Sequence, residues 1–308
     1  MMVQMLILLV GFFLLVKGAD WFVEGAASIA KKLGIPQLVI GLTIVAMGTS
    51  LPEAAVSITA ALDNNAGITI GNIVGSNILN ILIILGITAV ITNVSIQKST
   101  FYYEIPFMLI ITVILMIFGI TGSKITFMEG VIFWILFLLY LGYLYIMSKK
   151  GTEQEENVKD IPVWKCLLFM VLGGVMVVMG SDFAVSGATE IARFFGMSER
   201  FIGLTIVAFG TSLPELVTSV TAARKGNAGI AIGNIVGSNI FNILFVIGTA
   251  ALICSVPFER KFIIDTIIAV LSGVLLWGGT IKKKELRKPC GILMLLGYAA
   301  YFVYLCVI

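Results

Sequence analysis

Long apolar segments recur about every 30 residues along the chain. The plainest cover residues 78–91, 105–120, 131–147, 166–180 and the tail after residue 290, and weaker ones lie near 3–30, 35–62, 182–223, 230–254 and 262–280. Segments of roughly 20 apolar residues suit a bilayer crossing. They lack the period-two alternation of barrel strands, so they are expected to be helices. The pattern predicts an all-α membrane protein with ten transmembrane helices, the first of them retained and not cleaved as a signal peptide.

Composition agrees with this pattern. Of the 308 residues, 59% are hydrophobic and only 12% are charged, and the mean hydropathy is +1.08. Soluble domains are nearer 45–50% apolar and about 25% charged. A water-soluble enzyme, a disordered protein and a nucleic-acid binder are therefore excluded.

Two residue types limit the chemistry that the chain can perform. There is no histidine, which removes imidazole bases and histidine-ligated zinc. The four cysteines show no CxxC spacing, so neither a disulfide framework nor a thiolate metal site is expected. We expect no cofactor and no enzymatic activity.

The chain contains two copies of one unit. Residues 18–91 align with residues 180–253 without a gap, at a constant offset of 162, and 44 of the 74 positions are identical. The polar stretch 148–160 lies between the copies. The predicted organisation is a five-helix repeat over 1–147, a linker over 148–162 and a second repeat over 163–308.

An odd number of helices per repeat places the second copy upside down in the membrane. Lysine and arginine counts test the orientation. With the N-terminus outside, fourteen of these residues fall in inner loops and five in outer loops. Because positive charge accumulates in cytoplasmic loops, we expect both termini outside, a cytoplasmic linker and a multi-pass protein of the plasma membrane.

Glu53 and Glu215 occupy matching positions inside apolar stretches. An acidic residue in a membrane helix costs about 2.5–3.5 kcal/mol on insertion scales. No lysine or arginine shares either stretch, so a bound cation is the expected partner. A second interpretation is an S-x-x-E capping box, with Ser50 and Ser212 capping helices that restart at a proline. We expect the restart, but a glutamine would cap equally well without burying a charge.

Each glutamate ends a GTSLPE motif, at 48–53 and 210–215. Glycine and proline in these motifs predict broken second and seventh helices near mid-membrane. The break frees carbonyls and adds hydroxyls. These oxygen ligands suit Ca²⁺ and Na⁺ and offer nothing to zinc or copper. The carbonyl candidates are Ala46, Met47, Ala208 and Phe209, and the hydroxyl candidates are Thr49, Ser50, Thr211 and Ser212.

A second duplicated motif, GNIVGSNI, starts at residues 71 and 233. Its glycines allow close helix packing. Ser76 and Asn80 share one helix face, as do Ser238 and Asn242, and we favour cation coordination there. The remaining amides, Asn72, Asn77, Asn234 and Asn239, could equally bridge helices or bind ions. Asp20 and Asp182 also correspond, and either an ion pathway or a position near a helix kink or membrane edge would explain them.

With these two motifs, each present twice and in order, the whole chain resembles the cation/calcium exchanger superfamily in its prokaryotic sodium/calcium exchanger branch. The resemblance implies ten helices in two inverted five-helix repeats. It also implies that Ca²⁺ binds the two glutamates and the carbonyls of the neighbouring threonines. The implied metal-binding set is Glu53, Glu215, Thr49, Thr211, Ala46, Ala208, Ser50, Ser212, Ser76, Ser238, Asn80 and Asn242.

One position departs from some relatives, including potassium-dependent exchangers, which carry aspartate where this chain has Asn242. Asparagine in both copies leaves two formal negative charges, which disfavours K⁺ co-transport.

The predicted function is antiport of Na⁺ for Ca²⁺, extruding Ca²⁺ on the inward Na⁺ gradient. The alternatives are an H⁺/Ca²⁺ antiporter of the same superfamily, a cation channel and, as the enzyme reading, an intramembrane hydrolase, which lacks its usual motifs here. The expected partners are Ca²⁺, Na⁺ and membrane lipid, with no nucleic acid and no obligate protein partner.

Overall fold

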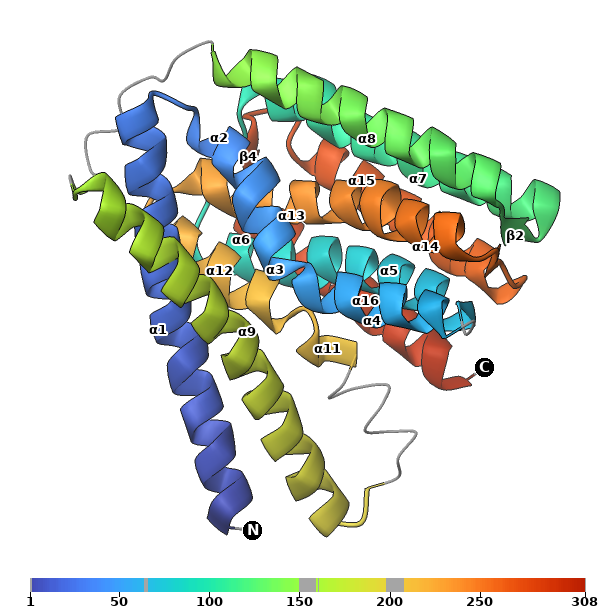
Figure 1. The fold of residues 1–308 in the computed structure, drawn as a ribbon, viewed down its shortest axis with the longest axis horizontal. Coiled ribbons are helices and arrows are strands. Elements are labelled where there is room, and N and C mark those ends of the chain that lie inside the picture. Colours follow the sequence, from blue (N-terminus) through green and yellow to red (C-terminus); the bar gives the residue numbers. More distant parts are fainter. Residues whose placement is uncertain (1, 64–65, 150–158, 160, 198–207, 308) are drawn as a thin grey trace.

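The computed structural model describes residues 2–63, 66–149, 159, 161–197 and 208–307, and helices dominate them (Figure 1). Eight described helices are long and apolar enough to cross a membrane, or nine when the bent pair Gln37–Thr49 and Leu51–Leu62 is one span. This confirms an all-helical membrane protein. The predicted seventh span includes residues 198–207, which lie outside the described residues, so the count of ten stays a prediction. So does the three-part division of the chain, although one helix ends at Ser148 and the next begins at Val163.

The first repeat contains one long helix, a bent span and three further spans. π-helical turns interrupt three of these spans. Its elements are α1 (Met2–Leu33), α2 (Gln37–Ile40), η1 (Gly41–Val45), α3 (Ala46–Thr49), α4 (Leu51–Leu62), α5 (Gly67–Leu79), η2 (Asn80–Leu85), α6 (Gly86–Ile91), β1 (Val94–Ser95), η3 (Thr100–Glu104), α7 (Ile105–Gly122), β2 (Lys124–Ile125) and α8 (Phe127–Ser148).

The second repeat follows the same plan where it is described. Its elements are α9 (Val163–Phe194), α11 (Ala208–Gly210), α12 (Leu213–Arg224), α13 (Ala228–Phe241), η5 (Asn242–Ile247), α14 (Gly248–Ile253), β3 (Val256–Pro257), α15 (Lys261–Gly279), β4 (Glu285–Leu286) and α16 (Lys288–Val307).

Two short antiparallel ladders join the repeats, β1 with β4 and β2 with β3. Because β1 and β2 lie before and after α7, each ladder closes one end of the helical block. The spacing of matching strands changes along the chain: β1 and β3 start 162 residues apart, whereas β2 and β4 start 161 apart. The first copy therefore holds one extra residue between its strands, and the π-helical turn η3 accommodates it.

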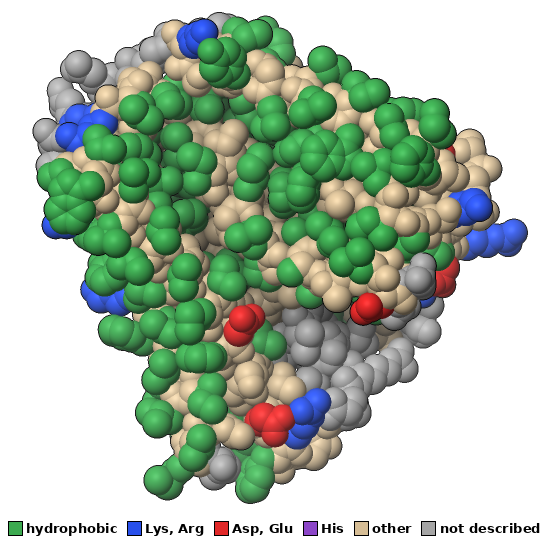
Figure 2. Space-filling model, viewed as in Figure 1, with side chains coloured by type: hydrophobic (Ala, Val, Ile, Leu, Met, Phe, Trp, Pro, Cys, Tyr) green, Lys and Arg blue, Asp and Glu red, His purple; other side chains and the backbone are tan. Residues whose placement is uncertain are grey.

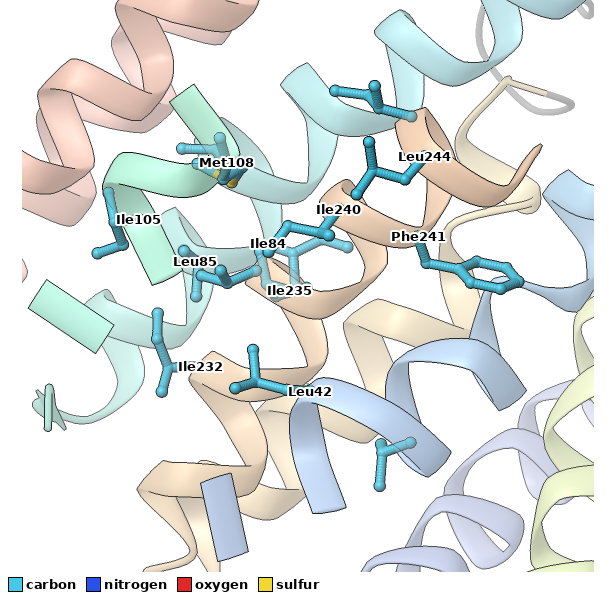
Figure 3. Packing of buried hydrophobic residues seen from close by; sticks show 14 of the residues in the cluster. Leu42, Ile84, Leu85, Ile105, Met108, Ile232, Ile235, Ile240, Phe241 and Leu244 are labelled. Carbon is cyan, nitrogen blue, oxygen red and sulfur yellow. The ribbon is translucent and has the colours of Figure 1, made fainter. Parts of the chain in front are cut away.

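The core lies around α13, in which every residue from Gly229 to Phe241 is buried. Leu42, Ile84, Met108 and Ile235 belong to the surrounding cluster (Figure 3). The outer surface is also largely apolar, and in the view of Figure 2 the charged side chains lie mostly towards its edges. An apolar exterior around a buried core suits a protein surrounded by lipid.

α1 and α9 pack against each other along a stripe of glycines spaced seven residues apart. A Cβ at Gly18 would lie 2.8 Å from the carbonyl oxygen of Gly173, and one at Gly11 would lie 2.9 Å from that of Gly180. The contacts run in opposite directions along the two helices, which are therefore antiparallel. Small residues let the backbones approach closely, as membrane helices require for strong packing.

Two neighbouring glycines on α9 test this packing. A Cβ at Gly173 would lie 2.5 Å from the backbone nitrogen of Phe22, whereas one at Gly174 would meet nothing closer than 3.8 Å. Both substitutions to alanine gain the same helix propensity. We expect Gly173→Ala to destabilise the protein by about 1–3 kcal/mol through overpacking and Gly174→Ala to leave it unchanged or slightly more stable. Thermal unfolding in detergent measures both, and equal melting temperatures would contradict the close packing.

Candidate ion-binding site

Glu53 and Glu215 lie in the first turns of α4 and α12, immediately after the chain breaks its helical path. Each helix carries its proline at the start, and α4 is bent 52° from the preceding helix, so both glutamates lie where a helix begins. Ser50 and Ser212 occupy the N-cap positions of α4 and α12, but neither hydroxyl makes the capping hydrogen bond of the second interpretation. The Ser50 hydroxyl donates to Glu215 Oε1 at 2.8 Å, and the Ser212 hydroxyl donates to Glu53 Oε1 at 3.2 Å. Each hydroxyl proton is thus directed at the carboxylate of the other repeat, a charge-assisted hydrogen bond.

These crossed hydrogen bonds hold the two carboxylates together inside the protein. Glu53 is 1% exposed and Glu215 is fully buried, and neither has an ion-pair partner in the described part of the chain. In each carboxylate the second oxygen, Oε2, accepts no hydrogen bond from a described group. Buried charges are normally paired or bind a metal. The pair thus has the chemistry of a cation site.

Asn80 and Asn242 extend this set of unsatisfied oxygens. Each amide nitrogen is used: Asn80 donates to Asn239 Oδ1 at 2.9 Å, and Asn242 donates to Asn77 Oδ1 at 3.1 Å. The Oδ1 atoms of Asn80 and Asn242 remain buried with no described donor. Together with the two Glu Oε2 atoms, they make four symmetry-related acceptors without donors.

Asn77 and Asn239 orient those two amides. Each donates its amide to the other's backbone carbonyl at 3.2 Å, which ties α5 to α13. Their Oδ1 atoms are then directed at Asn242 and Asn80, and this fixes which end of each ligand amide remains open. Residues that surround a metal site usually orient its ligands by hydrogen bonds of this kind.

Asn72 and Asn234 also bridge helices. Asn72 donates to the Glu53 carbonyl at 3.3 Å and to the Ser57 hydroxyl at 2.9 Å, and Asn234 repeats both contacts with Glu215 and Ser219. The sequence left open whether these amides bridge helices or bind ions. The contacts of Asn72 and Asn234, like those of Asn77 and Asn239, are contacts that bridge helices.

The predicted hydroxyls and carbonyls are distributed around the carboxylates. The Thr49 hydroxyl donates within its own helix and contacts Asn234 Oδ1 at 3.0 Å, and the Ser238 hydroxyl lies 3.4 Å from the Ala46 carbonyl oxygen. The Thr211 hydroxyl lies beside Glu53. Ser76 is buried one turn before Asn80, on the same face of the span. The side chain of Ala208 lies outside the described residues.

Three features of this region escape sequence reasoning. π-helical turns begin at Asn80 and Asn242, the Ser57 and Ser219 hydroxyls support the bridging amides, and a third fully buried carboxylate, Glu104, accepts a hydrogen bond from the Tyr143 hydroxyl. The π-turns carry no local sequence signal. Glu104 stands beside aromatic residues just after a polar segment, which makes it resemble a surface residue.

Other chemistry is missing from the part of the chain that the structure describes. It contains no group of three or more histidine, cysteine, aspartate or glutamate side chains that could hold a metal, and no disulfide joins the four cysteines. A pocket of about 520 Å³ beside α4 is lined by apolar residues such as Leu51, Phe137 and Phe241. Its lining includes one hydroxyl, that of Thr59, and no carboxylate or amide side chain.

Comparison with known proteins decides the family. The profile described as sodium/calcium exchanger protein matches residues 3–146 and 165–307. The chain belongs to the sodium/calcium exchanger family. It is 33% identical to the sodium/calcium exchanger MaX1 of Methanosarcina acetivorans over 98% of both chains, and 42% identical to the putative antiporter CaxA of Alkalimonas amylolytica over 82% of both.

Solved structures agree with the sequence relatives. The sodium-calcium exchanger NCX_Mj, soaked with 10 mM Na⁺ and no Ca²⁺, superposes with a TM-score of 0.87 at 33% identity, with 98% of both chains covered. This exchanger is thus a Na⁺/Ca²⁺ antiporter and not an enzyme, and Ca²⁺ and Na⁺ are its substrates.

Substitution of Asn77 tests whether the amide network of this exchanger orients the ligand side chains. Asn77→Ala removes the oxygen that holds Asn242, so we expect the apparent Ca²⁺ affinity to fall about 10–100-fold while the protein stays folded. Thr88→Val is the control, because the buried Thr88 hydroxyl in α6 bonds only to the Ile84 carbonyl of its own span. ⁴⁵Ca²⁺ binding to purified protein measures both. An unchanged affinity in Asn77→Ala would show that Asn242 needs no such support.

Proposed function

We propose that Ca²⁺ and Na⁺ compete for one site at the contact between the two repeats. Glu53 and Glu215 supply its charge. Ca²⁺ is held by both carboxylates and by the carbonyls of Thr49 and Thr211, and Na⁺ ions use the same carboxylates with hydroxyl, amide and carbonyl oxygens. The remaining proposed ligands are Ala46, Ala208, Ser50, Ser212, Ser76, Ser238, Asn80 and Asn242. The observation that carries this proposal is the set of buried acceptors without donors.

Charge explains why the two ions exclude each other. Two carboxylates carry two negative charges, which one Ca²⁺ neutralises. Adding Na⁺ ions to an occupied pocket would leave excess positive charge in a low-dielectric region, where ion–ion repulsion is many times stronger than in water. The ions therefore bind alternately.

The same charges prevent leakage. An empty site would hold two bare carboxylates against the membrane interior, which disfavours any movement that carries it across. Only a site neutralised by Ca²⁺ or by Na⁺ crosses readily. Exchange follows without any bound cofactor.

For the membrane arrangement we propose ten helices in two inverted repeats, with broken second and seventh spans. Both termini lie outside and the linker lies in the cytoplasm of a plasma-membrane protein. The antiparallel α1–α9 pair supports inversion, and the distribution of lysine and arginine supports the orientation. In this orientation the inward Na⁺ gradient drives Ca²⁺ out of the cell.

Neutral replacements test the carboxylates directly. Glu53→Gln and Glu215→Gln keep the side-chain shape but remove one charge from the pocket, so each is expected to reduce Na⁺-driven ⁴⁵Ca²⁺ uptake into proteoliposomes to background. Glu104→Gln is the matched control, since Glu104 is equally buried in a membrane helix but lies outside the proposed site. Normal uptake by both site variants would refute the assignment.

Imposing one gradient at a time tests the counter-ion. Because the proposed ligands include four serine hydroxyls, which suit Na⁺, an outward Na⁺ gradient should drive ⁴⁵Ca²⁺ uptake into proteoliposomes at fixed pH. A K⁺ gradient or a pH gradient of equal size should not. Uptake that follows the pH gradient alone would favour the H⁺/Ca²⁺ antiporter instead.

A further inference from the structure

A small group of charged side chains joins α1 to the C-terminal end of α12. Lys225, which follows the last turn of α12, contacts the Asp20 side chain at 3.0 Å and donates to the Asp20 carbonyl at 2.9 Å. Its ammonium also lies 4.0 Å from Glu24, which in turn accepts a hydrogen bond from Lys159 at 3.1 Å. We call Lys225, Asp20 and Glu24 the α1–α12 ion-pair group.

Apolar packing accompanies these contacts. Leu213 and Val217 of α12 lie against the small cluster formed where α1 and α9 meet, which includes Leu15 and Val177. α12 lies beside α1 and α9 (Figure 1). It is held to the pair by apolar contact near the ion-binding site and to α1 by charge at its far end.

The matching helix of the first repeat is not held in this way. α4 corresponds to α12, and α9 corresponds to α1, but among the described residues α9 makes no contact with α4 comparable to that of α1 with α12. Leu51, the counterpart of Leu213 at an offset of 162, is 56% exposed. The α1–α9 pair thus closes against α12 and stands away from α4.

The segments 18–91 and 180–253 contain α4, α12 and most of the contact regions of α1 and α9, and they are identical at 44 of 74 positions. α9 and α4 therefore offer each other surfaces similar to those of α1 and α12. Alternating access in transporters built from inverted repeats moves one bundle against the rest around a fixed site. In the exchanged arrangement, α9 would close against α4 and Asp182 would approach the end of α4, as Asp20 now approaches the end of α12.

The charges at the two ends do not match. The counterpart of Lys225 is Asp63, at the same position after the last turn of α4, and the counterpart of Asp20 is Asp182. Glu24 is replaced by Ser186. Closure against α12 therefore brings opposite charges together, and closure against α4 brings two carboxylates together.

We propose that Lys225 is a positioning residue of the transport cycle, which favours closure of the α1–α9 pair against α12 over closure against α4. The α1–α12 ion-pair group stabilises the first state, and the repulsion between Asp63 and Asp182 disfavours the second. The proposal rests on the transport cycle described above, but it concerns the balance between the two states and not the ion ligands.

Thiol labelling at both ends tests the balance. In a background with the four cysteines replaced, single Leu213→Cys and Leu51→Cys reporters are labelled with a polar maleimide in lipid nanodiscs, where both faces are accessible, without Ca²⁺ or Na⁺. Lys225→Gln should raise the Leu213→Cys labelling rate about threefold, the effect of a half-exposed ion pair, and lower the Leu51→Cys rate. Asp63→Lys, which offers Asp182 a partner, should change both rates in the same directions.

The control removes an ion pair elsewhere. Lys261, the first residue of α15, lies 2.9 Å from the Glu259 carboxylate. Lys261→Gln removes this ion pair and should change neither labelling rate. Combining Lys225→Asp with Asp63→Lys exchanges the charges of the two ends and should give the largest shift. Rates that rise at both reporters would mean local loosening and would overturn the proposal, as would rates unchanged by every variant. Because labelling requires no transport, either result would leave the exchange function standing.

Discussion

Two carboxylates buried side by side, with no described basic residue beside them, are the constraint around which this exchanger is built. Each acid costs about 2.5–3.5 kcal/mol to place in a membrane helix, and mutual repulsion adds to that cost. Crossed hydrogen bonds from Ser50 and Ser212 offset part of it. The remaining oxygens stay without donors, and a bound cation stabilises them most directly.

The crossed bonds also explain why the protein needs both copies of its unit. Each glutamate accepts a hydrogen bond from a serine of the other repeat. The amide network is reciprocal in the same way, since Asn77 and Asn239 each bond to the other and to the other's neighbouring ligand amide. A site made of exchanged contacts cannot form within a single copy.

The sequence predicted the features of this protein that depend on composition and on local chemistry. Apolar run lengths predicted the helices, the gap-free repeat predicted the matched halves, and a charge inside an apolar stretch singled out Glu53 and Glu215. Glycine and proline predicted the break before α4. Each of these signals is contained in a short window of the chain or in a direct comparison of two windows.

The parts that sequence reasoning missed depend on partners distant in the chain. Whether an asparagine binds an ion or bridges helices is decided by a neighbour about 160 residues away, as for Asn80 and Asn239. The hydrogen bond from the Ser50 hydroxyl to Glu215 was missed for the same reason, because that acid belongs to the other repeat. Glu104 is buried and accepts a hydrogen bond from Tyr143, which lies 39 residues further along the chain, so no local pattern marks it.

Both repeats supply the same types of residue to the ion-binding site. The site residues alone therefore do not explain why the α1–α9 pair would prefer closure against one repeat. The ligand residues are of the same types in both copies, whereas the copies differ at other positions that can favour one state over the other. The copies differ at the ends of the broken helices, where lysine stands in one and aspartate in the other. Selection can change such peripheral charges without disturbing ion coordination. An antiporter assembled from a duplicated unit can thereby keep its ion-binding chemistry symmetric while the balance between its two states is set at its edges.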